Sequence, residues 1–251
     1  MTLLPWLLAV GGGILGAIFG SFIGALCSRW PGGRSVMTGR SHCDHCQRTL
    51  TAAELLPLIS YLLQKGQCRH CGGSVDRDQF WAELSAAAIG VCAFAFLALP
   101  QAVIFAVMAW LLLPLIFLDY RHLWLPGRLT FILALSGPLL CHWLLPGYDL
   151  ALQLWAGAGA FAAMELLRLL FKLLRGKDGM GAGDPKLFGA IALWIPPPTL
   201  PFLLLIASGT GLFIAFMLRS KGAAFSSKML PFGSMLGFAA IIVQCAAMLT
   251  L

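Results

Sequence analysis

The sequence contains little charge, and acidic side chains are the scarcest part of it. Asp and Glu number 10 in 251 residues, against 17 Lys and Arg, and charged residues make up 11% of the chain. An ordinary soluble domain has about 25% charged residues. Hydrophobic residues reach 59%, and uncharged runs of about 20 residues, the length of a membrane-spanning helix, recur along the chain. This composition excludes an ordinary soluble domain and predicts a polytopic membrane protein.

The amino terminus lacks the features of a cleaved signal. No charged side chain occurs from residue 3 to residue 27. A secretory signal peptide would have a basic segment followed by a shorter apolar stretch. We therefore expect residues 4–27 to be retained as the first transmembrane helix.

Splitting the chain at its charges predicts an all-α polytopic membrane protein with about eight transmembrane helices. The sixth predicted span is short for a hydrocarbon core of about 30 Å, and if it fails to cross, every later segment changes sides. We expect two regions, residues 1–79 with the first helix and a cytoplasmic zinc-binding loop, and residues 80–251 with the remaining helices. The predicted spans are residues 4–27, 80–99, 101–118, 129–146, 150–171, 185–196, 199–218 and 231–250.

All 17 Lys and Arg residues lie in or beside four of the segments that join these spans. These segments follow spans one, three, five and seven, so the cations all face one side of the membrane. The positive-inside rule predicts that this side is cytoplasmic and that both termini lie on the other side. The net charge of +7 would then face the anionic lipid headgroups of the bilayer rather than nucleic acid.

Two Cys-x-x-Cys pairs, CDHC and CRHC, lie in the first of these loops, at about residues 28–79. This spacing is typical of a tetrahedral structural zinc site, whereas disulfides are disfavoured in the reducing cytosol. Free or redox-active thiols are the alternative. Four thiolates leave no open coordination position, so the ion is expected to fold the loop rather than to catalyse. The expected ligands are Cys43, Cys46, Cys68 and Cys71, with His42, His45 and His70 as flanking residues and Cys27, Cys92, Cys141 and Cys245 as small apolar side chains.

Carboxylates beside apolar spans are costly and therefore mark candidate functional sites. Asp119 ends the third predicted span and Asp184 begins the sixth, at the same membrane edge. Asp184 followed by Pro185 is also typical of a helix start, although capping alone does not explain the preceding GMGAG. The other carboxylates have structural interpretations: Glu83 as a helix cap or partner of Arg77, Glu165 paired with Arg168, and Asp149 and Asp178 as solvated loop residues.

Two carboxyl groups at one depth indicate acid–base chemistry on an amide, with one activating water and the other polarising the carbonyl group. Asp184, at a helix start and near Lys186, is expected to be the ionised base. Asp119, at the end of an apolar helix, is expected to be the protonated acid. Because such a pair titrates jointly, the two roles could also be exchanged.

Several motifs together resemble the type IV prepilin leader peptidases, which are intramembrane aspartyl proteases with a Gly-x-Gly-Asp motif. The chain has GMGAGD (179–184), DYRHLWLPGRLT (119–130), GSF...RWP (20–31), PLISYLLQKGQC (57–68) and LPFGSMLG (230–237), in the family's order. The resemblance implies cleavage of the basic leader from prepilins or type II secretion pseudopilins at the cytoplasmic face of the bacterial inner membrane. It implies that Asp119 and Asp184 are catalytic and that the substrate's apolar helix enters laterally between spans. It also implies N-methylation of the new amino terminus with S-adenosylmethionine, associated with residues 1–79.

Two positions depart from the family pattern. Gly127 stands where the family usually has Asp in Leu-Pro-Asp, and Gly24 stands where it commonly has Asn in Gly-Ser-Phe-Leu-Asn. The second departure lies in the region associated with methylation, and no glycine loop of the dinucleotide-binding type marks a binding site for S-adenosylmethionine.

Three other functions compete with the bifunctional enzyme. The chain could be a peptidase without methyltransferase activity, a proton-coupled transporter that uses the paired aspartates, or a membrane scaffold whose zinc loop binds a secretion partner. Transporter sites lie more often near the membrane midplane between two related halves, and the sequence has no internal repeat. The oligomeric state does not follow from the sequence.

Overall fold

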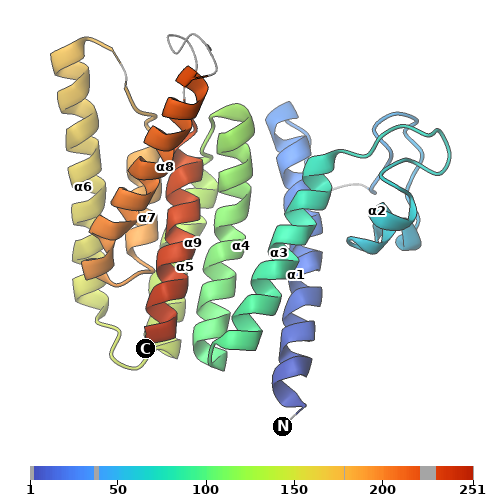
Figure 1. The fold of residues 1–251 in the computed structure, drawn as a ribbon, viewed down its shortest axis with the longest axis horizontal. Helices are drawn as coiled ribbons and strands as arrows, with labels where there is room; N and C mark the ends of the chain where they lie inside the picture. The colour runs from blue at the N-terminus through green and yellow to red at the C-terminus, as the bar shows by residue number, and fades with distance from the viewer. Residues whose placement is uncertain (1–2, 37–39, 178, 221–229, 251) are drawn as a thin grey trace. The chain divides into compact units, whose positions relative to one another are not determined.

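The computed structural model describes residues 3–36, 40–177, 179–220 and 230–250. Within these residues the chain is α-helical and 3-10 helical, with two isolated β-bridges and no strand, which confirms the all-α prediction. It forms two compact units, unit 1 (Met1–Leu97) and unit 2 (Ala98–Leu251) (Figure 1). Asp178, and Lys221 and Lys228 among the 17 cations counted from the sequence, lie outside the described residues.

Unit 1 is built on two long helices, α1 (Leu4–Arg29) and α3 (Arg77–Phe96). They pack antiparallel along a line of α1 glycines spaced four residues apart, with Gly12 against Gly90 and Gly20 against Ala82. A Cβ added to Gly16 would lie 2.1 Å from the carbonyl oxygen of Ala86. Small residues at this spacing let the backbones of membrane helices approach closely, so the glycines hold this pair together.

The segment between these helices has little core of its own. It contains η1 (Trp30–Gly32), η2 (Ala52–Leu55) and the five-residue helix α2 (Ile59–Leu63). Among its described residues from 30 to 76, only Cys68 is buried. Buried apolar side chains therefore contribute little to the order of this segment.

Unit 2 is a bundle in which α4 is the most deeply buried long helix. Helices α5 and α9 pack against α4, and the short α7 contacts α5, α6 and α9. Pro114 lies inside α4 and Pro138 inside α5. The helices are α4 (Leu99–His122), α5 (Gly127–Leu144), α6 (Leu150–Arg175), α7 (Asp184–Ala192), η3 (Pro197–Thr199), α8 (Leu200–Ser220) and α9 (Phe232–Thr250).

Seven of the eight predicted spans are helices long and apolar enough to cross a membrane. The sixth span, expected at residues 185–196, is helical only over the nine residues of α7. Gly189 of α7 lies beside Phe161, and further along the chain the carbonyl of Ile195 is reached by Gln153 near the start of α6. The chain thus runs antiparallel to α6, from the end where α6 finishes toward the end where it begins, and the non-helical residues 193–196 continue this course. This segment is not among the seven candidate spans.

Residues 193–195 are held by side-chain donors from three places in unit 2. Tyr148 Oη donates to the carbonyl of Leu193 (2.9 Å), Gln244 Nε2 to that of Trp194 (3.3 Å) and Gln153 Nε2 to that of Ile195 (3.0 Å). Non-helical backbone at membrane depth is tolerated only when its polar groups are satisfied within the protein. We call this arrangement the carbonyl clamp; it satisfies carbonyl groups that lie outside helical structure after α7.

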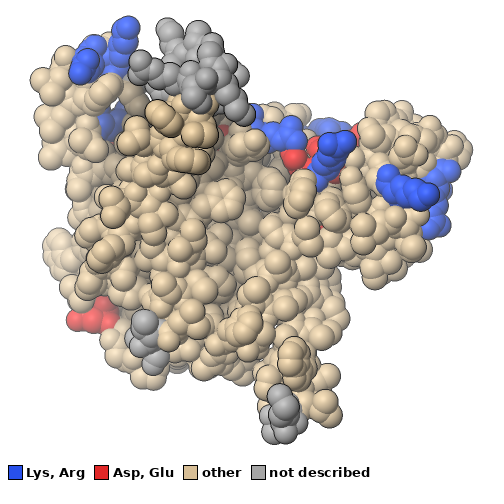
Figure 2. All heavy atoms as spheres, in the orientation of Figure 1, with Lys and Arg blue, Asp and Glu red and all other residues tan. Residues whose placement is uncertain are grey.

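The cations of unit 2 gather at one end of its helices. The described Lys and Arg residues lie at the end of α4, the start of α5, the last turns of α6 and just after it, the start of α7 and the end of α8. Figure 2 shows Lys and Arg on the visible face of unit 2 near the finish of α6 and none at its opposite end. In unit 1 the described cations lie between the last turn of α1 and the first residue of α3.

Candidate active site and metal centre

Asp119 lies in the last turn of α4, where its side chain is buried with 5% of its surface exposed. Its Oδ2 accepts a hydrogen bond from the backbone N–H of Ser234 (2.6 Å) and lies 3.0 Å from the Ser234 hydroxyl. The same hydroxyl lies 2.9 Å from the carbonyl oxygen of Ile116. Ser234, at the start of α9, therefore fixes one oxygen of this carboxyl group and leaves the other oxygen without a described partner.

Asp184 is the first residue of α7 and is equally buried. Its Oδ2 accepts from the backbone N–H of Gly181 (3.1 Å), and its own N–H donates to the carbonyl of Gly181 (3.2 Å). Gly183 is the N-cap of α7, and no side chain caps the helix there. The carboxyl group thus turns back toward the glycine loop instead of capping the helix, so the capping interpretation of Asp184 was wrong.

Glycines let the starts of α7 and α9 approach the loop between α4 and α5. A Cβ on Gly183, next to Asp184, would lie 2.8 Å from Leu125 Cβ. A Cβ on Gly233, next to Ser234, would lie 2.8 Å from Leu125 Cδ1 and 3.0 Å from Asp119 Oδ2. Leu125 therefore lies between the start of α7 and the start of α9, and a larger residue at either glycine would push the ends apart.

The charge of Asp119 acts on Asp184, so the structure brings together two residues that are 65 positions apart. Lys186, expected to keep Asp184 ionised, acts instead on Glu165 of α6. Glu165 also pairs with Arg168, through Arg168 Nε (3.0 Å) and Nη2 (2.6 Å), as the sequence predicted. The predicted support of Asp184 by Lys186 is therefore replaced by coupling to a second carboxyl group.

In unit 1 the four predicted cysteines form one cluster. The Sγ atoms of Cys43, Cys46, Cys68 and Cys71 lie within 4.8 Å of one another. Four thiolates at this separation suit a tetrahedral metal ion. The backbone N–H groups of Cys71 and His70 lower the pKa of Cys68 to about 6, so part of the set is readily available as thiolate.

The two halves of the cluster have the same backbone pattern. The first closes with a β-bridge between His42 and Thr49, and the second with a bridge between Gln67 and Ser74. In each half the residue after the second cysteine, Gln47 or Gly72, has a positive φ, 58° and 70° respectively. The repeated pattern predicts that each half presents its two sulfurs to the shared centre in the same way.

The residues around the cluster support it without entering it. His45 Nε2 lies 3.2 Å from the Ser74 carbonyl and its ring covers Gly73, while His42 Nδ1 lies 3.1 Å from the Arg40 carbonyl. These contacts agree with the prediction that the histidines flank the site. Arg48 pairs with Glu54, whose carboxylate also accepts from the N–H and hydroxyl of Thr51.

Unit 1 has a second polar cluster, which the sequence analysis did not identify. Glu83 of α3 is buried and accepts from the backbone N–H of Leu58 (2.7 Å) and from Gln79 Nε2 (2.8 Å). Gln79 Nε2 also donates toward the carbonyl and the hydroxyl of Ser21. Glu83 therefore anchors the loop to α3, whereas α3 is capped by Asp76. The expected capping or Arg77-pairing role of Glu83 was wrong.

Gly24, one of the two departures from the family pattern, lies against this cluster. A Cβ there would lie 2.4 Å from Gln79 Oε1. The carboxamide of Gln79 thus occupies space next to α1 that a side chain at position 24 would need. In the other unit, Asp149 caps α6 by accepting from the N–H of Leu152 (3.1 Å), which gives the predicted turn residue a definite structural role.

Two family models match the chain. The bacterial peptidase A24 amino-terminal domain matches residues 14–97, and the type IV leader peptidase family matches residues 105–216. The comparison with solved structures gave no match.

Curated relatives carry corresponding names. The prepilin leader peptidase/N-methyltransferase of Aeromonas hydrophila is 36% identical over 210 residues, covering 82% of this chain and 71% of the relative. The protein of the same name from Dichelobacter nodosus is 31% identical, covering 86% and 74%. The type 4 prepilin-like proteins leader peptide-processing enzyme of Escherichia coli O78:H11 (strain H10407 / ETEC) is 30% identical, covering 96% and 94%. The chain therefore belongs to the type IV leader peptidase family.

Proposed function

We propose that this multi-pass membrane protein is a prepilin peptidase that cleaves the leader from type IV prepilins or type II secretion pseudopilins and then N-methylates the new amino terminus. The observation that carries the proteolytic half is the pair of buried carboxyl groups, Asp119 and Asp184, at one end of unit 2. The names of the relatives support both halves.

The aspartate pair suits hydrolysis of an amide. Two carboxyl groups that feel each other's charge favour holding one proton between them. The ionised group takes a proton from water, whose oxygen attacks the scissile carbonyl carbon, while the protonated group donates to the carbonyl oxygen. When the C–N bond breaks, the leaving amine takes a proton from the first group. We assign Asp184 as base, because it lies at the amino-terminal end of α7, and Asp119 as acid, because it lies at the carboxyl-terminal end of α4.

Proteolysis is assigned to residues 80–251 and methyl transfer to the amino-terminal region, residues 1–79. S-adenosylmethionine would supply the methyl group to the free amine. The four cysteines would hold zinc, whose role is to order the loop, since a four-thiolate site has no open position for a substrate.

We place the protein in the bacterial inner membrane, with both termini periplasmic and the cysteine loop cytoplasmic. The support is the distribution of Lys and Arg, which lie at one end of the helices of unit 2 and between the two long helices of unit 1. The aspartate pair lies at the cationic end of unit 2, where a leader on the cytoplasmic side would be accessible.

The decisive experiment compares the purified wild type with Asp119→Asn and Asp184→Asn on a prepilin, and separately measures labelled methyl transfer to an already processed pilin. We expect each variant to lose cleavage by about 10²–10⁴-fold, the usual contribution of a general acid or base. Methyl transfer should remain, because it needs neither carboxyl group.

A cleavage rate within a few-fold of the wild type in either variant would refute the aspartate-pair mechanism. Loss of both activities together with a lowered melting temperature would indicate unfolding, so the folding of each variant is checked by circular dichroism. If the wild type cleaves but never methylates, the peptidase assignment stands and the methyltransferase assignment is wrong.

A further inference from the structure

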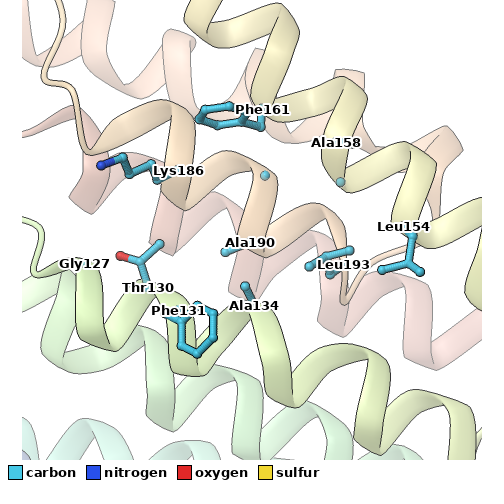
Figure 3. Close-up of a pocket in the computed structure, with 12 residues that line it drawn as sticks. Gly127, Thr130, Phe131, Ala134, Leu154, Ala158, Phe161, Lys186, Ala190 and Leu193 are labelled. Carbon is cyan, nitrogen blue, oxygen red and sulfur yellow. The ribbon is translucent and has the colours of Figure 1, made fainter.

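Unit 2 carries an apolar groove with a cavity volume of about 430 Å³ (Figure 3). Its lining comes from α5 (residues 127–134), from α6 (154–161), and from α7 with the residue that follows it (186–193). Each helix contributes residues at positions i, i+3, i+4 and i+7, which lie on one helical face. Three helix faces thus line a single trough.

The lining favours an apolar helix as the occupant. Ala134 of α5, Ala158 of α6 and Ala190 of α7 all line the groove and carry only a methyl group. Small residues of this kind let the surface of another membrane helix approach closely. The volume is within the range of a ligand pocket, and it suits the side chains on one face of a helix rather than a whole helix. The exposed rings of Phe131 and Phe161 line the walls of α5 and α6.

The groove also has a direction. Lys186, its one charged lining residue, lies two positions after Asp184, and in Figure 3 its nitrogen points along α7 away from Leu193. From Lys186 to Leu193 the helical rise would be about 10 Å. An occupant that complements this lining is apolar along its length and has hydrogen-bond acceptors or negative charge at the end near Asp184.

We propose that this groove binds the apolar segment of the substrate that follows the scissile bond, and so aligns that bond with Asp184. The inference rests on the proposed function, because it takes a prepilin as substrate. It identifies Ala134, Ala158 and Phe131 as residues that determine substrate binding without taking part in the chemistry. A lipid acyl chain is the competing occupant.

The first test fills the groove from its wall. Ala158→Phe places a ring in the trough, whereas Ala163→Phe places the same ring on the opposite side of α6, at another exposed position that does not line the groove. We expect Ala158→Phe to raise KM for a full-length prepilin about tenfold with little change in kcat, as loss of uniform binding does. Ala163→Phe should behave as the wild type. A short peptide that ends before the apolar segment should be cleaved equally by all three.

The second test does not depend on cleavage. A photoreactive phenylalanine analogue replaces Phe131 in the groove, or Phe213 on α8 as a control of similar exposure, 67% and 62% respectively. We expect only the probe at 131 to cross-link to the apolar segment of the prepilin. Cross-linking to lipid alone, with an unchanged KM in Ala158→Phe, would overturn the proposal and assign the groove to lipid. If the wild type cleaves nothing, the proposed function fails, and the cross-link still decides what occupies the groove.

Discussion

In unit 1 the cysteine cluster lies in a segment with almost no buried side chains, whereas in unit 2 the aspartate pair lies inside a packed helix bundle. Cys68 is the one buried residue among those described from 30 to 76. Asp119 and Asp184, by contrast, are each 5% exposed. The first site would be ordered by the zinc ion that we propose it binds, while the second is ordered by helix packing. One chain would therefore combine a site ordered by a metal ion with a site ordered by helix packing, and different substitutions should disrupt each of them.

The largest effect should follow from removing cysteines of the cluster. Metal binding contributes about 10–16 kcal/mol in structural zinc peptides, and this free energy is what folds them. We expect Cys43→Ser combined with Cys68→Ser to contain no zinc by elemental analysis and to be cut rapidly by protease between residues 40 and 76. The helices of unit 2 should keep the protease resistance of the wild type.

Cys92→Ser is the matched control, because Cys92 lies on α3 outside the cluster. It should retain one zinc ion per chain. If the double variant kept both its metal and its resistance to protease, the loop would be ordered by something other than the cluster.

An intermediate effect is expected in unit 2 from Gln153→Leu, which removes one donor of the carbonyl clamp. The carbonyl of Ile195 would then be buried without its partner, at a cost of about 1–3 kcal/mol. The free energy of unfolding in mixed detergent micelles measures this loss. Leu152→Ala, an exposed position one residue away, should change it less. Equal losses in the two variants would mean that the clamp contributes nothing specific.

The smallest effect concerns the pH dependence of the loop in unit 1. The N–H of Thr51, together with its hydroxyl and Arg48, holds the pKa of Glu54 below its usual range. Because this pKa is lower in the folded state, ionised Glu54 stabilises the loop at pH values above its unfolded-state pKa of about 4.3. The stabilisation is lost as the pH falls through the folded-state pKa. We expect Glu54→Gln to speed amide exchange at Thr51 at neutral pH, with a difference from the wild type that narrows in acid.

The cysteines titrate in both the wild type and Glu54→Gln, so the difference in amide exchange between these two proteins reports on Glu54. Asp44→Asn, which removes an exposed pair with Arg34 (3.5 Å), should have little effect on Thr51. A difference between wild type and Glu54→Gln that grew as the pH fell would reverse the assigned sign.

Local sequence features predicted the parts of the fold that depend on local chemistry. Long uncharged runs identified seven helices, Cys-x-x-Cys spacing identified the cluster, and carboxylates at the ends of apolar runs identified Asp119 and Asp184. Each of these signals lies within a few residues of the feature it predicts, so helix packing was not needed to find it.

The parts that depend on which helices meet were not predicted. Ser234 is 115 positions from Asp119, and LPFGSMLG was identified only as part of a family pattern. Leu125 and the carbonyl clamp gave no signal, because one leucine or one glutamine in an apolar chain has many possible partners. The α1 glycines do show a four-residue spacing, which could have predicted the close packing of α1 with another helix.

The contact between Ser234 and Asp119 has a consequence for the order of synthesis. A ribosome adds about 5–20 residues per second, so the 115 positions between them correspond to roughly 6–23 s of translation. During that interval Asp119 has already been made but the helix that fixes its carboxyl group has not. On the proposed mechanism, the newly made protein remains inactive as a protease until α9 is in place, and other membrane segments emerging nearby are not cut during that interval.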